Sequence, residues 1–161
     1  MVANGIFCSK LIFQISLWGG TEEYLLNSLQ TIQNKAARCV TKRGIYTPVA
    51  ELLKQCGWLS VRQLVFYHSS IFIYKTLQTS HPKYIHDKLL NKFSYNTRLA
   101  ATQGICMGAD FKAKLTLTEK SFMNRSVVSY NMLPLEIRKI PKIDTFKTKL
   151  KLWIQVNRDL I

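Results

Sequence analysis

The stretch at residues 61–79 constrains the fold more than any other, because it is apolar on two sides of a predicted helix. One face carries Val61, Leu64, Val65, His68, Ile71 and Phe72, and a second carries Phe66, Ile73 and Leu77. A helix that is apolar almost all round must be covered by other elements on most of its sides. Ser60 and Gln63 stand in capping-box spacing at its start. We therefore expect this helix to begin after Ser60 and to lie at the centre of a helical bundle.

Helical patterns also flank this stretch. The predicted elements are a buried helix in GIFCSKLIFQISLW, helices at about 21–42, 48–56, 82–90 and 121–132, a short turn after Pro134, and a last helix capped by Asp144. The buried face of the helix at 21–42 is predicted from the apolar stripe Leu25, Leu29, Ile32, Ala36 and Val40.

Residues 91–120 lack helical periodicity and include the alternating stretch FKAKLTLT, which predicts an extended arm or a small β-hairpin. With 161 residues, 47% of them hydrophobic, the chain is long and apolar enough for one domain with its own core. The predicted fold is mainly α. It is a single domain over residues 1–161, an irregular bundle of about six helices with an extended or small hairpin segment near 91–120.

The chain is strongly basic. Its 23 Lys and Arg residues outnumber its 9 Asp and Glu residues and give a formal charge of +14, which favours a polyanionic partner, nucleic acid before a membrane surface. The basic residues are spread along the chain rather than gathered in a tail, so the fold must assemble any binding surface. A basic, solvated surface without a partner is the alternative.

Three basic residues of the helix predicted at 21–42 fall on a face other than its apolar stripe. Lys35, Arg38 and Lys42 stand at i, i+3 and i+7, a row that could follow the phosphates of one strand. A solvated face is the equally simple interpretation. Arg43 and Arg62 flank the next, shorter helix and could extend the same surface.

Catalytic and metal-binding patterns are absent from the sequence. The four cysteines include no CxxC pair, which argues against a zinc site. No paired carboxylates stand at a metal-binding spacing, and the sequence has neither a Gly-rich phosphate loop nor a nucleophile elbow. We therefore expect no catalytic residue, metal site or cofactor in this chain. Trp58, which follows a helix-terminating Gly57, is interpreted as a packing residue rather than a base-stacking one.

Five blocks, in order along nearly the whole chain, resemble one known segment. They are LWGGTEEYLLNSLQTIQNKAARCVTK, TPVAELLKQCGWLSVRQLVFYHSSIFIYKTL, PKYI, YNTR and SFMNRSVVSYNMLPLEIRKIPKIDTFKTKLKLWI. The segment is the thumb and the region after the palm of non-LTR (LINE-like, Jockey-type) retrotransposon reverse transcriptases. Each block alone is weak, and their order and spacing make the resemblance specific.

The resemblance implies a region that holds nucleic acid for an RNA-directed DNA polymerase and is inactive alone, because the catalytic aspartates and their Mg²⁺ belong to the palm. The implied partners are template RNA or a DNA primer–template duplex, together with the palm and endonuclease domains of the parent polyprotein. Arg98 and Arg125 lie in family-like blocks and are further candidate contacts, although either could instead hold loop carbonyls.

Two alternatives stay open from the sequence. The chain could be a stand-alone helical RNA- or DNA-binding module, or a decayed transposon fragment without activity. The decayed-fragment alternative is suggested by departures from the family pattern, such as Ser126, where relatives usually carry glycine. The cysteines fit core thiols of an intracellular protein, in the nucleus or the cytoplasm. The N-terminal apolar run is too short to span a bilayer, so no membrane partner is expected.

Overall fold

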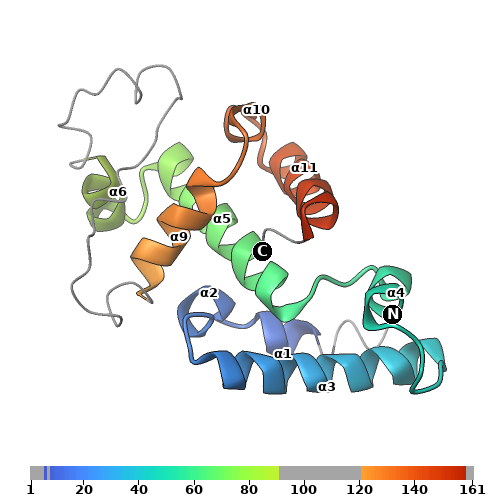
Figure 1. Cartoon of the computed structure of the whole chain (residues 1–161). Coiled ribbons are helices and arrows are strands. Elements are labelled where there is room, and N and C mark those ends of the chain that lie inside the picture. The colour runs from blue at the N-terminus through green and yellow to red at the C-terminus, as the bar shows by residue number, and fades with distance from the viewer. Residues whose placement is uncertain (1–5, 7, 91–120, 159–161) are drawn as a thin grey trace.

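The computed structural model describes residues 6, 8–90 and 121–158. These residues form α1 (Ser9–Ile12), α2 (Ile15–Trp18), α3 (Glu23–Thr41), α4 (Val49–Cys56), α5 (Val61–Thr79), α6 (Lys83–Leu90), α9 (Phe122–Asn131), α10 (Leu135–Arg138) and α11 (Ile143–Val156), shown in Figure 1. The described part of the chain contains no strand, which confirms the mainly α prediction. The predicted extended or hairpin segment at 91–120 lies outside the described residues.

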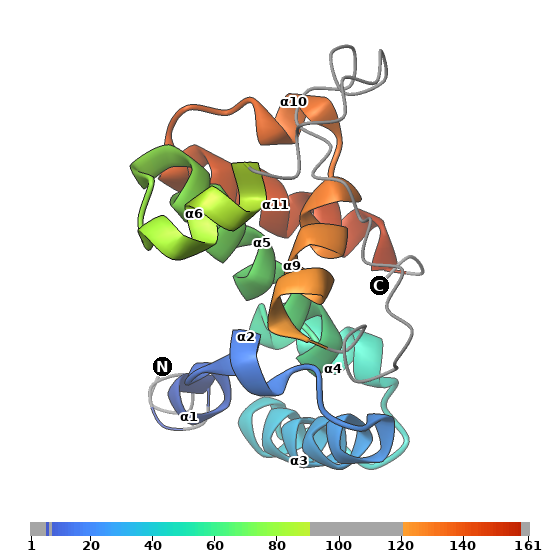
Figure 2. The same ribbon diagram turned by 90° about the vertical axis from the view of Figure 1, so that its left-hand side faces the viewer.

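Helix α5 runs through the middle of the molecule, with α2 and α3 on one side and α9 and α11 on the other (Figures 1 and 2). Its buried residues are Val61, Leu64, Val65, Phe66, Ser69, Ser70, Ile71, Ile73, Tyr74 and Thr76, which face every direction around the helix axis. The helix begins at Val61 behind a complete capping box. The predicted central position and start of this helix are therefore confirmed.

Aromatic side chains of α5 fix the helices of the C-terminal half. Tyr74 stacks on Phe146 of α11, with ring centroids 4.1 Å apart, and its hydroxyl donates to the backbone oxygen of Ile140 at 2.7 Å. Phe72 meets Phe122 of α9 edge to face at 4.9 Å. Such aromatic pairs contribute about 0.5–1.5 kcal/mol beyond their buried area. The connection that contains α10 is therefore fixed at Ile140, and the start of α9 is fixed at Phe122.

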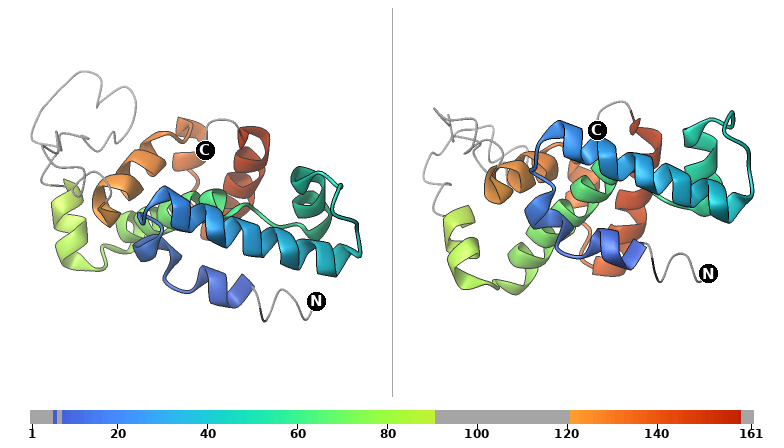
Figure 3. Two further views of the ribbon diagram at one scale, coloured as in Figure 1. Left: turned by 60° about the horizontal axis from the view of Figure 1, so that its bottom comes forward. Right: turned by 90° about the horizontal axis from the view of Figure 1, so that it is seen from below.

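Helix α3 spans the molecule from α2 to α4 (Figure 3), and its buried face differs from the prediction. Leu25, Ile32 and Val40 are between 41% and 51% exposed, whereas Leu26, Gln33 and Ala37 are buried. The inward face is shifted because α3 makes polar contacts with the α4–α5 connection as well as apolar ones. A search for apolar periodicity overlooks a buried glutamine and a small alanine.

The N-terminal helix and the start of the last helix also differ from the prediction. The single buried helix expected near the N-terminus is instead α1 and α2, separated by Gln14 in the left-handed conformation at φ 52°. Asp144 is not the N-cap of the last helix, since Lys142 occupies that position and Asp144 lies in the first turn. There it accepts a hydrogen bond from Lys147 Nζ at 3.4 Å.

Gly19, which ends α2, lies close to Val65 of α5. A Cβ atom at this position would stand 2.5 Å from Val65 Cγ2 and 2.7 Å from the backbone oxygen of Ile15. Neither neighbour is a flexible side-chain end that could move away at small cost. Only glycine therefore fits here, although the backbone conformation itself, with φ −64°, suits any residue.

We predict that Gly19→Ala destabilises the fold by about 1–3 kcal/mol, the usual cost of overpacking a core. Gly44→Ala is the matched control, because a Cβ atom added there would have nothing within 4 Å. That control should be neutral or stabilising by up to about 1 kcal/mol. Urea denaturation of both variants tests the prediction, and equal midpoints would contradict the close α2–α5 approach.

Burial also predicts a specific sensitivity to alkaline pH. Tyr130 of α9 is 3% exposed. Burial, opposed by the nearby Arg138 charge and reinforced by Tyr74, raises the pKa of Tyr130 to about 12. Its neutral form is therefore favoured in the folded state. The resulting stability is fully present below pH 10, near the unfolded pKa, and is lost as the pH rises through 12, by about 3 kcal/mol in all.

We predict that the stability of Tyr130→Phe falls less steeply between about pH 9 and pH 11.5 than that of the wild type. Tyr46→Phe is the control, because Tyr46 is 92% exposed and should leave the wild-type slope unchanged. Denaturant midpoints measured across this pH range give the comparison. A Tyr130→Phe slope equal to that of the wild type would show that Tyr130 titrates alike in both states.

Candidate nucleic-acid interface

The row of basic residues predicted on α3 lies on its solvent side. Lys35 and Lys42 are exposed, and at about 100° per residue they stand on the opposite side of the helix from the buried Gln33 and Ala37. Lys42 is the C-cap, in the left-handed conformation. No ion pair engages Lys35 or Lys42 within the described part of the chain. Both ammonium groups are thus available to an anionic partner.

The connection from α3 to α4 continues this basic region. Arg38 is half-buried and donates through Nη2 to the backbone oxygen of Ile45 at 3.5 Å, so it has a structural contact as well as a charge. Arg43 is exposed in the same connection, which also carries Tyr46, the most exposed large hydrophobic side chain described. Cations next to an exposed ring are typical of surfaces that bind nucleic acid. We call Lys35, Arg38, Lys42, Arg43 and Tyr46 the α3 basic surface.

Arg62 lies apart from the α3 basic surface. Its guanidinium pairs with Glu23 and donates to Asn27 Oδ1 at 3.0 Å. Asn27 is eight residues before Lys35, or about 12 Å along the helix axis. The prediction that Arg62 extends the same surface is therefore not supported by its position. Arg98 lies outside the described residues.

Arg125 of α9 holds a backbone carbonyl. Its Nη2 donates to the backbone oxygen of Ser16 in α2, which links two elements far apart in sequence. Burial lowers the pKa of its guanidinium below the usual value. Of the two roles considered for this residue, the contact with the carbonyl is the one present in the fold.

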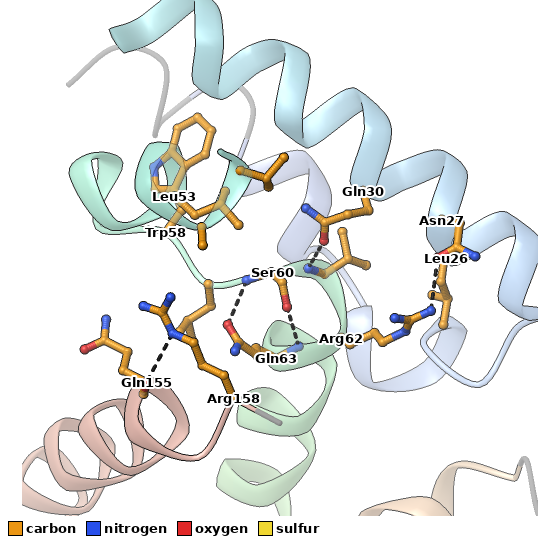
Figure 4. Close-up of a pocket in the computed structure, with 14 residues that line it drawn as sticks. Leu26, Asn27, Gln30, Leu53, Trp58, Ser60, Arg62, Gln63, Gln155 and Arg158 are labelled. Carbon is orange, nitrogen blue, oxygen red and sulfur yellow. Dashed lines mark hydrogen bonds between the residues drawn. The ribbon is translucent and has the colours of Figure 1, made fainter. Parts of the chain in front are cut away.

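A second polar region surrounds the start of α5. A pocket of about 280 Å³ lies between α3, α4, the start of α5 and the end of α11 (Figure 4). Gln30 accepts from the backbone nitrogen of Val61 at 2.8 Å, and Gln33 donates to the backbone oxygen of Leu59 at 2.8 Å. These two glutamines of α3 fix the α4–α5 connection, and with it Trp58 in the pocket wall.

Trp58 has the packing role predicted for it, since it lies against the cluster of Ala37, Leu52 and Leu53. Its indole also lines the pocket, which Gln155 and Arg158 approach from the end of α11, across from α3 (Figure 4). Neither Gln155 nor Arg158 is identifiable from the sequence. The pocket joins segments more than 90 residues apart, and no local pattern reports such proximity.

The described residues include no arranged metal-binding cluster. No group of three or more His, Cys, Asp and Glu side chains in that part of the chain is placed to hold a metal ion. No described helix is long and apolar enough to cross a membrane. Comparison with protein-family models, curated proteins and solved structures returned no match for this chain.

We predict that Arg125→Met lowers stability by about 1.5–3 kcal/mol, because the Ser16 carbonyl loses a charge-assisted hydrogen bond. Methionine keeps most of the aliphatic bulk, so the effect reports the guanidinium. Lys149→Met, at an exposed position of α11, removes the same charge and should change stability by less than about 0.5 kcal/mol. Thermal denaturation compares the two, and an unchanged midpoint for Arg125→Met would argue against the structural role.

Proposed function

We propose that this chain holds nucleic acid and performs no chemistry itself, as the region after the palm of a non-LTR retrotransposon reverse transcriptase would. Its ligand is template RNA or primer–template duplex, bound through phosphates with little sequence preference. The palm of the parent polyprotein would supply the catalytic aspartates and Mg²⁺. We assign no catalytic residue or cofactor to the chain.

One observation carries this proposal: in a chain of net charge +14, the α3 basic surface is exposed apart from the half-buried Arg38, and Lys35 and Lys42 lie opposite the buried face of α3. Lys35 and Lys42 are less than two turns apart on one side of a straight element, so one face of α3 can follow one phosphate strand. The exposed ring of Tyr46 adds a stacking surface at its end. The charged surface supports nucleic-acid binding in general, and the five ordered sequence blocks are the reason for proposing this particular family.

A stand-alone helical RNA- or DNA-binding module would use the same surface. The sequence upstream of the reading frame distinguishes this module from the retrotransposon region. Palm and endonuclease sequence in the same frame would support the retrotransposon origin. The binding experiment below applies to both, and it separates both from a decayed fragment with no activity.

We predict salt-sensitive binding of duplex and RNA, because each neutralised phosphate releases a counterion. With about four to six phosphate contacts, the log–log slope of affinity against salt on duplex DNA is about −4 to −5. Changing Lys35, Arg38 and Lys42 together to Ala should weaken binding to all sequences alike. It should also make the slope less steep, by up to the amount that about three phosphate contacts contribute. Titrations at several salt concentrations measure both effects.

The matched control changes Lys75, Lys83 and Lys139 to Ala, three exposed residues on other elements, so that both triple variants have the same net charge. The control should keep nearly the wild-type slope. Equal losses in the two variants would assign binding to diffuse charge rather than to the α3 basic surface. No binding by the wild type at low salt would leave the decayed-fragment alternative.

A further inference from the structure

Trp58 lines two pockets, and each of them is also lined by a positively charged side chain. The pocket of Figure 4 holds Arg158 and Arg62 on its walls. A second hollow, of about 290 Å³, is lined by Trp58 together with Lys151, whose Nζ donates to the backbone oxygen of Gly57 at 3.2 Å. Arg158 and Lys151 of the C-terminal segment thus each share a pocket with the indole.

Some of the polar groups around the pocket already make hydrogen bonds within the fold, and these include the backbone donors at the start of α5. The backbone nitrogens of Ser60, Val61 and Gln63 at the start of α5 all donate within the fold, at 3.1, 2.8 and 3.3 Å. The helix end therefore has few backbone donors left for an anion. Recognition of any ligand here must come from side chains.

The unused side-chain groups are chiefly donors. In the described part of the chain, no group accepts from the side-chain amide nitrogen of Gln63 or from that of Gln155. Among the described residues, the guanidinium of Arg158 donates only through Nε, to the backbone oxygen of Gln155 at 3.1 Å. A ligand suited to this pocket has a flat apolar face for the indole, acceptors along one edge, and a negative charge beside it.

We propose, on the basis of the function proposed above, that this pocket takes one unpaired base of a bound single strand. Trp58 is its stacking surface, and Arg158 contacts the adjacent phosphate. A nucleobase has the required flat face and acceptor edge, and a strand places a phosphate next to every base. Paired bases are excluded, because both faces of a base in a duplex are covered by its neighbours. The pocket is also smaller than most pockets for drug-sized ligands, which take about 300–1,000 Å³.

The test compares single-stranded and duplex ligands with the full chain. The probes are a labelled oligouridine, a duplex of equal length, and a single strand carrying the fluorescent base 2-aminopurine. The variants are Trp58→Leu, which keeps an apolar group against Leu52 and Leu53, and Arg158→Gln at an exposed side chain. Lys149→Gln, on α11 but outside both hollows, is the charge-matched control. Circular dichroism checks that each variant is folded.

We expect Trp58→Leu to weaken oligouridine binding by about tenfold and Arg158→Gln by about fivefold relative to Lys149→Gln. Duplex affinity should change less than about twofold. The quenching of 2-aminopurine by bound wild type should be relieved in Trp58→Leu. If Trp58→Leu does not fold, Arg158→Gln decides alone.

Failure of the proposed function and failure of the base-binding pocket would give different results. Wild type that binds neither oligouridine nor duplex at low salt would overturn the proposed function, and this pocket's role with it. Wild type that binds both, with Arg158→Gln equal to Lys149→Gln on oligouridine, would overturn only the base-binding pocket. The nucleic-acid-holding function would then rest on the α3 basic surface alone.

Discussion

Helix α5 has buried side chains in every direction around its axis, and most of the other helices pack against it. An isolated helix with this surface would expose apolar area in every direction, and its burial is worth about 25 cal/mol per Å². Each neighbour therefore covers a different sector: Gly19 lets α2 approach Val65, Phe122 of α9 meets Phe72, and α11 stacks on Tyr74. The other helices therefore pack around α5, and their contacts with it account for much of the core.

The connection between α4 and α5 is held by polar contacts rather than by burial. Gln30 and Gln33 of α3 bind the backbone of residues 59–61, and satisfied backbone groups of this kind tolerate little displacement. This explains the face of α3 that turns inward, since a helix that presents two glutamines to a backbone cannot also present Leu25 and Ile32. The same contacts position Trp58 beside the end of α11.

The chain's charge favours a polyanionic ligand. A protein with 23 basic residues against 9 acidic ones is suited to bind polyanions. The two proposed contacts differ in chemistry. The α3 basic surface offers exposed ammonium groups to a phosphate backbone, whereas the Trp58 pocket offers a flat ring and unused donors to a base.

The helical class, the central place of α5 and its capped start could be predicted from the sequence, because periodicity and capping are local properties of consecutive residues. The same holds for the charge and for the positions of Lys35, Arg38 and Lys42 on one helix. Three other features needed the packed structure: Arg62 pairs with Glu23, Arg125 holds the Ser16 carbonyl, and Arg158 lines the same pocket as Trp58. These features bring together residues separated by dozens of positions. They depend on how the helices pack, and no local sequence pattern indicates them.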